Sequence, residues 1–167
     1  MPSPEPVEVV KERRAKALAG LVERVPYVQH LGLSFERRGD ELTAILNYSD
    51  RLIGNPMLPA LHGGATGAFL EMAAVMELTW GVVWRMIEEG GEGAAAIAAG
   101  RYPPIPKTID FTVDYLRSGL PRDAYARARV NRAGRRYASV YVEAWQDNRA
   151  RLFAAATGHF LMPTQDD

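Results

Sequence analysis

Residues 63–86, GGATGAFLEMAAVMELTWGVVWRM, decide the fold of this chain. Alanine, leucine, methionine and glutamate dominate the stretch, and these residues are strong helix formers. Apolar residues fall on nearly every side of the predicted helix, so it is expected to be buried on most of its faces. Gly63 and Gly64 at its start leave backbone N–H groups unshielded by side chains. The sequence therefore predicts a long core helix with an accessible N-terminal end.

The chain after this helix changes to a two-residue period. In residues 109–115 (IDFTVDY) apolar and polar side chains alternate, which is typical of a half-buried strand. Three more strands are predicted at 122–131, 136–146 and 150–162, with turns at 132–134 and 147–148. One face of these strands carries small residues: Ala124, Ala126, Ala128, Ala138, Ala144, Ala154, Ala156 and Gly158. Because small side chains allow a close approach, the sheet is expected to curl around the core helix.

The chain before the core helix supplies one helix and one hairpin. An amphipathic helix is predicted at 7–24 and ends at Pro26. Two short strands within 31–48 are expected to meet at Gly39-Asp40. Residues 49–61 are predicted to be a loop, and residues 90–104 a connector or weak helix. This order of elements predicts the α+β class, with an N-terminal helical extension (1–25) followed by a single domain (26–167).

Composition excludes several classes of protein. The chain has 167 residues, of which 47% are apolar, so one domain can bury a sizeable core. Twenty basic residues balance twenty acidic ones, which argues against a nucleic-acid partner or a membrane surface. There is no cysteine, so disulfides and thiolate chemistry are excluded. The N-terminus lacks the apolar segment of a signal peptide, and a cytoplasmic location is expected.

The basic residues are not spread evenly. Residues 101–136 hold nine Arg or Lys against three Asp, a local excess of six positive charges. Such a segment is either a solvated outer face of the sheet or a patch for an anionic small molecule with several phosphates. The candidates for phosphate contacts are Arg117, Arg132, Arg135 and Arg136, which fall near predicted strand ends and turns.

Two features near the start of the core helix can carry chemistry. Glu71 lies among apolar residues, and an unpaired carboxylate in such a setting costs several kcal/mol or takes up a proton. It either reaches the helix edge, is neutralised by an arginine, or serves an active site. His62, Gly63 and Gly64 place free N–H groups at the positive end of the helix dipole, where a carbonyl oxygen gaining charge can bind. Glu77 lies on another side of the helix and is expected to find solvent or a cation.

The chain resembles the hot-dog-fold acyl-CoA thioesterases of the phenylacetate-degradation (PaaI-like) type. Three features carry this resemblance: His62-Gly63-Gly64, Glu71 nine residues after the histidine, and the strand 108–117 (TIDFTVDYLR). The resemblance covers residues 26–162. It implies a long helix wrapped by an antiparallel sheet, assembled as a homodimer or a dimer of dimers. It also implies hydrolysis of a small or medium, or aromatic, acyl-coenzyme A without metal or bound cofactor, the coenzyme A being part of the substrate.

The same resemblance assigns roles to individual residues. Glu71 is implied as the general base on water or as the nucleophile, and the N–H of Gly63 or Gly64 as the group that polarises the thioester carbonyl. Asn55 resembles a loop asparagine that orients water or substrate. His62 is expected to cap the helix or orient the loop, and the long segment 85–106 to line the acyl pocket. His30 and His159 have no acidic partner at ligand spacing in the sequence, so no zinc site is expected.

Two other functions remain open from the sequence. Folds host unrelated functions, so the chain could be an acyl-CoA-binding domain without catalysis. The retained Glu71 and paired glycines favour the enzyme. A hot-dog hydratase or dehydratase would need an Asp/His pair positioned for proton transfer, and no such pair is evident in the sequence. The absence of a G-x-S-x-G motif gives no support to serine-hydrolase chemistry.

Overall fold

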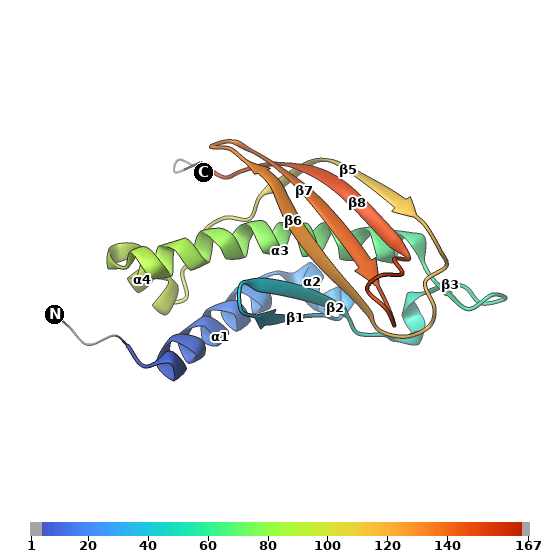
Figure 1. Cartoon of the computed structure of the whole chain (residues 1–167), viewed down its shortest axis with the longest axis horizontal. Coiled ribbons are helices and arrows are strands. Elements are labelled where there is room, and N and C mark those ends of the chain that lie inside the picture. The colour runs from blue at the N-terminus through green and yellow to red at the C-terminus, as the bar shows by residue number, and fades with distance from the viewer. Residues whose placement is uncertain (1–4, 165–167) are drawn as a thin grey trace.

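Helix α3 (Gly63–Glu89) lies along the concave side of a six-stranded antiparallel sheet in the computed structural model, which describes residues 5–164 (Figure 1). The strands of this sheet are β1 (Leu33–Arg38), β2 (Glu41–Leu46), β5 (Lys107–Tyr115), β6 (Ala124–Ala133), β7 (Tyr137–Trp145) and β8 (Ala154–Leu161). The remaining elements are α1 (Val7–Glu23), α2 (Pro26–Leu31), a 3-10 turn at Asp50–Leu52, the two-stranded β3 (Ile53–Asn55) and β4 (Ala60–Leu61), and α4 (Gly91–Ala98).

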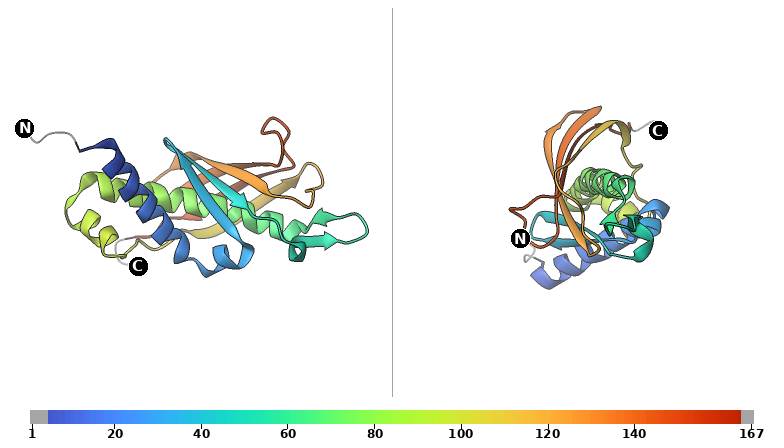
Figure 2. Two further views of the ribbon diagram at one scale, coloured as in Figure 1. Left: turned by 90° about the horizontal axis from the view of Figure 1, so that it is seen from below. Right: turned by 90° about the vertical axis from the view of Figure 1, so that its right-hand side faces the viewer.

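The sheet has the order β1-β2-β6-β7-β8-β5, so β1 and β5 form its edges. Its concave face is built from small residues, as predicted: Ala126, Ala144 and Ala156 are buried against the helix side of the sheet. The end-on view of Figure 2 shows the sheet curving around α3. A Cβ at Gly158 would lie 2.5 Å from the Phe111 ring, so this position in β8 has no room for a larger residue. The predicted α+β arrangement of a sheet around a core helix is confirmed.

The sheet is split between β2 and β6. These strands pair only at Ala44–Leu46, opposite Ala124–Ala126, and separate beyond that point. Arg127 bridges the opening, because its Nη1 lies 2.6 Å from Glu41 and its Nε donates to the Thr43 hydroxyl at 3.0 Å. A cavity of about 250 Å³ lies at this split, and Glu77 of α3 lines it.

The first helix packs on the core rather than standing apart from it. Ala17, Leu18 and Leu21 of α1 are buried and belong to the same apolar cluster as the buried side chains of α3. Helix α3 is long and apolar enough to cross a membrane by length and composition, but 67% of its most apolar window is buried inside the protein. Burial of this kind is expected of a core helix.

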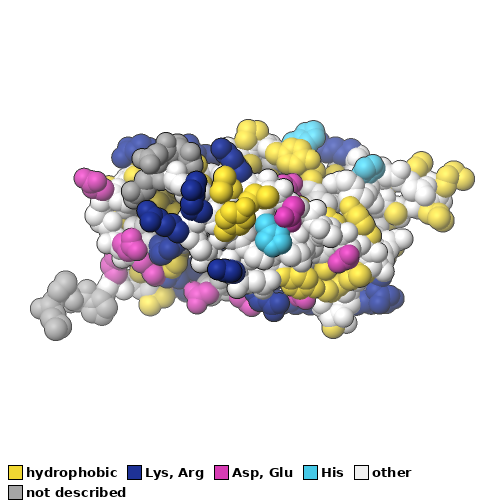
Figure 3. All heavy atoms as spheres, turned by 90° about the horizontal axis from the view of Figure 1, so that it is seen from above, with side chains coloured by type: hydrophobic (Ala, Val, Ile, Leu, Met, Phe, Trp, Pro, Cys, Tyr) yellow, Lys and Arg dark blue, Asp and Glu magenta, His cyan; other side chains and the backbone are white. Residues whose placement is uncertain are grey.

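Most predicted elements are present with bounds shifted by at most four residues, but three features differ. The predicted loop 49–61 contains the β3–β4 hairpin, whose tip residues Met57 and Leu58 are 87% and 73% exposed. This hairpin projects from the body, and hydrophobic side chains cover the projecting end (Figures 2 and 3). Helix α2 precedes β1 where no helix was predicted, whereas α4 confirms the helix alternative for residues 90–104. Strand β5 is less buried than its alternation predicts, because it is an edge strand: Ile109 is 47% and Tyr115 58% exposed.

Candidate active site

His62 closes the N-terminal end of α3. Its Nδ1 accepts a hydrogen bond from the Gly64 N–H at 2.9 Å, so the imidazole caps the helix as its sequence position predicts. A Cβ at Gly54 would lie 2.7 Å from the His62 Cα, so glycine at that position lets the β3–β4 hairpin pack against the cap.

The two glycines at the start of α3 differ in what they offer a ligand. The Gly64 N–H is already bound to His62. The Gly63 N–H has no hydrogen-bond partner among residues 5–164, while the Gly63 carbonyl accepts a bond from the Tyr115 hydroxyl at 2.7 Å. Of the two glycines, only Gly63 therefore keeps an N–H that is free to donate to a ligand, at the positive end of the longest helix in the described chain.

Glu71 lies two turns further along α3 and is half-buried. Its Oε1 accepts a hydrogen bond from the Thr108 hydroxyl of β5 at 2.5 Å. Of the open interpretations of Glu71, neutralisation by an arginine does not occur in the described chain, since no salt bridge involves this residue. Thr108 was not identified from the sequence, because the two residues are 37 positions apart and only the register of β5 on α3 brings them together.

Gly63 and Glu71 both face edge strand β5, since Tyr115 contacts the first and Thr108 the second. Eight residues of helix place them about 12 Å apart along the axis. The exposed side of β5 and the end of α3 thus carry a hydrogen-bond donor and a carboxylate on the same side of the molecule.

Glu77 differs from its predicted environment. It is half-buried at the split between β2 and β6 and makes no ion pair among the residues described, although Arg127, Arg129 and Arg149 line the same cavity. Burial raises the pKa of Glu77 from 4.5 to about 7. The prediction of solvent or a cation is met only in part, since Glu77 lines a cavity with three arginines but pairs with none of them. A helical wheel gives the side of the helix on which a residue lies but not the place where the sheet covers it.

The structure places Asn55 at the base of the β3–β4 turn. Its Oδ1 accepts the N–H groups of Met57 and Leu58 at 3.0 and 3.3 Å, which fixes the conformation of the exposed tip. In this conformation the side-chain oxygen is used by the turn. A role of Asn55 toward substrate would therefore act through the tip that it holds or through the amide nitrogen.

The predicted basic residues do not form one patch. Arg117 lies in the loop after β5, where its backbone N–H bonds to the Phe153 carbonyl at 3.0 Å. Arg132, Arg135 and Arg136 lie at the β6–β7 hairpin, about 30 Å away along β6. In Figure 1 this hairpin is at the end of the sheet near the C-terminus. Two of the other arginines are paired, Arg122 with Asp147 and Arg127 with Glu41.

His159 has an acidic neighbour that its sequence position did not reveal. Its Nδ1 lies 2.8 Å from Asp110 Oδ1, on the adjacent strand β5. The sequence showed no acidic partner at ligand spacing, and this pair could not be seen there because its members are 49 residues apart and meet only through strand register. Within residues 5–164, no group of three or more His, Asp or Glu side chains is arranged to hold a metal ion.

Comparison with known proteins agrees with this architecture. The family model of the thioesterase superfamily matches residues 58–152. The chain is 28% identical over 157 residues to the medium/long-chain acyl-CoA thioesterase YigI of Salmonella typhimurium, covering 92% of this chain and 97% of that protein.

Solved structures show the same fold. A Chromobacterium violaceum protein is 33% identical with a TM-score of 0.63, covering 93% of this chain and 96% of that one. The Escherichia coli PaaI protein of the phenylacetic acid degradation operon has a TM-score of 0.68 at 13% identity, covering 92% of this chain and 95% of that one, which is a likeness of fold alone. The chain therefore belongs to the thioesterase superfamily and is a thioester hydrolase with the PaaI-like hot-dog fold.

Proposed function

We propose that this protein hydrolyses acyl-coenzyme A with a medium-chain acyl group, with Glu71 as the catalytic carboxylate. The observation that carries the proposal is the Thr108–Glu71 hydrogen bond, which holds a carboxylate of the core helix at the exposed edge of the sheet. Medium chain length is the range that the sequence prediction shares with the printed name of the relative YigI. Water and the thioester give a carboxylic acid and the free thiol, so the proposed reaction needs no metal or bound cofactor.

In the proposed reaction, the thioester carbonyl accepts a hydrogen bond from the Gly63 N–H, which stabilises the charge that develops on oxygen. Glu71 either takes a proton from the attacking water or attacks the carbonyl carbon itself and forms an anhydride that water then opens. Collapse of the tetrahedral intermediate breaks the carbon–sulfur bond, and the thiolate leaves as coenzyme A. His62 holds the loop and the helix end in place and transfers no proton.

The complete site is proposed to lie between two chains of a homodimer. A single chain separates Gly63 from Glu71 by about 12 Å along α3, whereas catalytic groups must lie within about 3 Å of the atoms they act on. Edge strand β5 offers unpaired backbone groups and the exposed Ile109 and Tyr115 to a second copy. Antiparallel packing of two copies around a two-fold axis would bring the Gly63 end of one chain to Glu71 of the other. Dimers of this kind can pair again into tetramers, and a cytoplasmic location is proposed for them.

A panel of substrates tests the proposal. Purified protein is incubated with acetyl-, octanoyl-, palmitoyl- and an aromatic acyl-CoA, and released coenzyme A is followed with a thiol reagent. We expect coenzyme A to be released fastest from octanoyl-CoA. The Glu71→Gln variant, purified in the same way, serves as the control for a contaminating hydrolase. Tight binding of acyl-CoA without thiol release would establish the binding domain instead. Hydration of an enoyl-CoA without thiol release would establish the hydratase.

A further inference from the structure

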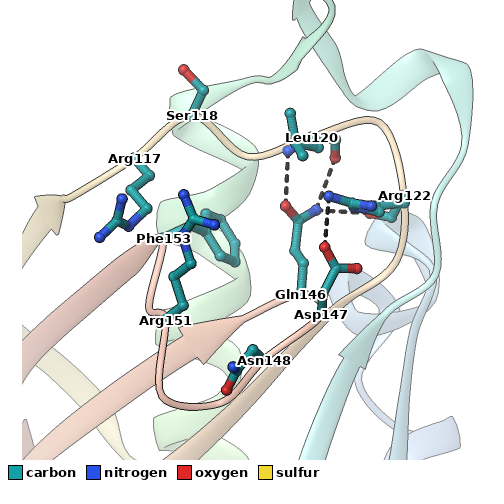
Figure 4. A pocket seen from close by; sticks show the side chains of 9 residues that line it. All are labelled: Arg117, Ser118, Leu120, Arg122, Gln146, Asp147, Asn148, Arg151 and Phe153. Atoms are coloured by element: carbon teal, nitrogen blue, oxygen red, sulfur yellow. Dashed lines mark hydrogen bonds and ion pairs between the residues drawn. The ribbon is translucent and has the colours of Figure 1, made fainter.

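A cavity of about 390 Å³ lies beside the N-terminal end of α3, among the loops that follow β5 and β7. It is lined by three guanidinium groups, Arg117, Arg122 and Arg151, and by a single carboxylate, Asp147. Only Arg122 is neutralised, by Asp147 at 2.7 Å. Across residues 5–164 the guanidinium groups of Arg117 and Arg151 have no hydrogen-bond or ion-pair partner. In Figure 4 both extend into the same space beside the Phe153 ring.

The loops that form this cavity are fixed by the protein itself. The Gln146 side chain accepts the Leu120 N–H at 2.9 Å and donates to the Leu120 and Arg122 carbonyls at 2.8 and 3.2 Å. The N–H groups of Leu116 and Arg117 both bond to the Phe153 carbonyl. Arg117 and Arg151 are two unpaired cations that line one cavity, and an anion between them offsets their repulsion. The cavity therefore favours a ligand with negative charge.

The cavity is joined to the proposed oxyanion end of the site. The Leu61 N–H donates to the Gly119 carbonyl at 2.8 Å, so the loop carrying Arg117 is bonded to the residue just before His62. A Cβ at Gly119 would lie 3.0 Å from the Leu61 side chain, which shows how closely the loop packs. The loop that lines the cavity is therefore in direct contact with the strand that leads into His62 and Gly63.

We propose that Arg117, Arg122 and Arg151 bind the phosphates of the adenosine 3′,5′-bisphosphate part of coenzyme A, on the chain that supplies the Gly63 N–H. The inference rests on the proposed function. The proposed phosphate site does not include Arg135 and Arg136, which were candidates from the sequence but lie on the hairpin at the other end of β6. Guanidinium groups suit this ligand because their planar N–H donors bind two phosphate oxygens at once. A cavity of a few hundred Å³ is of the size that small-molecule sites usually have.

The test compares two substrates that differ only in the nucleotide. Octanoyl-CoA and octanoyl-pantetheine are assayed with the wild type, with Arg117→Ala/Arg151→Ala, and with Arg135→Ala/Arg136→Ala as the control of equal charge change. We expect the first variant to raise the KM for octanoyl-CoA about 10- to 100-fold, with kcat within threefold. Its kcat/KM for octanoyl-pantetheine should equal that of the wild type. The control variant should match the wild type with both substrates.

A second measurement does not depend on catalysis. Titration calorimetry with adenosine 3′,5′-bisphosphate should show binding to the wild type that weakens with added salt, and no binding to Arg117→Ala/Arg151→Ala. Equal losses with both substrates would make these arginines structural, and a KM effect confined to Arg135→Ala/Arg136→Ala would place the phosphates at the hairpin. Either result overturns the inference. If the wild type binds the bisphosphate but cleaves no thioester, the proposed function fails while the site stands.

Discussion

The hydroxyl of Thr108 lies 2.5 Å from a carboxylate oxygen of Glu71 and joins the edge strand of the sheet to the core helix. A hydrogen bond to a charged acceptor holds the side chain in one rotamer and satisfies one of its oxygens. The second oxygen remains available to water or substrate. A single contact thus explains how a carboxylate can be kept on a largely apolar helix and directed toward the exposed edge of β5.

Replacement of Glu71, the proposed catalytic carboxylate, gives the first prediction. Glu71→Gln keeps the shape of the side chain and can still accept the Thr108 hydrogen bond, but it loses the ionisable oxygen. We expect kcat to fall about 100-fold or more, in line with the loss of a general base or nucleophile, while the melting temperature changes little. Steady-state hydrolysis of octanoyl-CoA measures this. Activity within threefold of the wild type would remove Glu71 from the mechanism.

The Thr108 hydroxyl gives the second prediction. Thr108→Val removes the donor at nearly constant volume, so Glu71 loses its partner, and kcat should fall about tenfold with KM unchanged. Thr108→Ser restores the hydroxyl and should recover most of the activity. A purely structural role would instead lower the melting temperature of the valine variant and leave kcat intact.

The third prediction concerns stability and pH. Burial raises the pKa of Glu77 from 4.5 to about 7, so between these values the folded protein binds more protons than the unfolded chain. The free energy of unfolding therefore falls as pH rises through this window. Glu77→Gln removes the effect and should stabilise the protein by about 1–2 kcal/mol at pH 8, a value reduced for the partial exposure of the group. At pH 4 the variant should match the wild type.

Urea unfolding at pH 4 and pH 8, at one protein concentration, measures the difference. The exposed Glu36 of β1 provides the matched control, because Glu36→Gln makes the same charge change at the surface. Equal effects of the two substitutions at pH 8 would show that overall charge, and not the burial of Glu77, sets the pH dependence.

Helix α3, the long strands and their turns could be predicted because each has a recognisable local sequence pattern. The 63–86 stretch is apolar on all sides, and 109–115 alternates, so neither needed tertiary information. The β3–β4 hairpin could not be found this way, because its strands are only three and two residues long and the segment between them contains Pro56 and Pro59. Helix α4 was predicted only as one of two alternatives for residues 90–104, because its glycines have low helix propensity.

The candidate active site could likewise be predicted only where local sequence signals exist. Glu71, His62 and Gly63 could be selected from the sequence, because an acidic residue on an apolar helix and glycines at its start are local signals. Thr108, Arg151 and Asp110 could not, since each acquires its contact only through the register of distant strands and loops. The burial of Glu77 depends on the split between β2 and β6, and the hydrophobic periodicity of the sequence does not show where such a split lies.

The fourth prediction distinguishes the effect of losing the Gly63 N–H from the effect of replacing the glycine by a larger residue. Gly63 is the first residue of α3 and follows an extended residue, His62 with ψ 131°, which is the backbone that a following proline requires. Gly63→Pro therefore removes the N–H without breaking the helix, and kcat should fall about 100-fold or more. Gly63→Ala keeps the N–H, and its Cβ meets only ordinary contacts with the Tyr115 ring at 3.5 Å. The alanine variant should retain activity, and equal activity of both variants would exclude this donor.

The last prediction tests whether two chains share one site. In a heterodimer of Glu71→Gln and Gly63→Pro chains, one site combines the intact Gly63 of the first chain with the intact Glu71 of the second, while the other site carries both defects. Random exchange places half of all dimers in this mixed class, so mixing should restore about a quarter of the wild-type sites. If each site lay within one chain, every site would carry one defect and mixing would restore nothing. Subunit exchange is first confirmed with differently tagged chains. An active monomer in sedimentation, or no recovery after confirmed exchange, would contradict the shared site, because the 12 Å between the two groups along α3 would then have to be closed within a single chain.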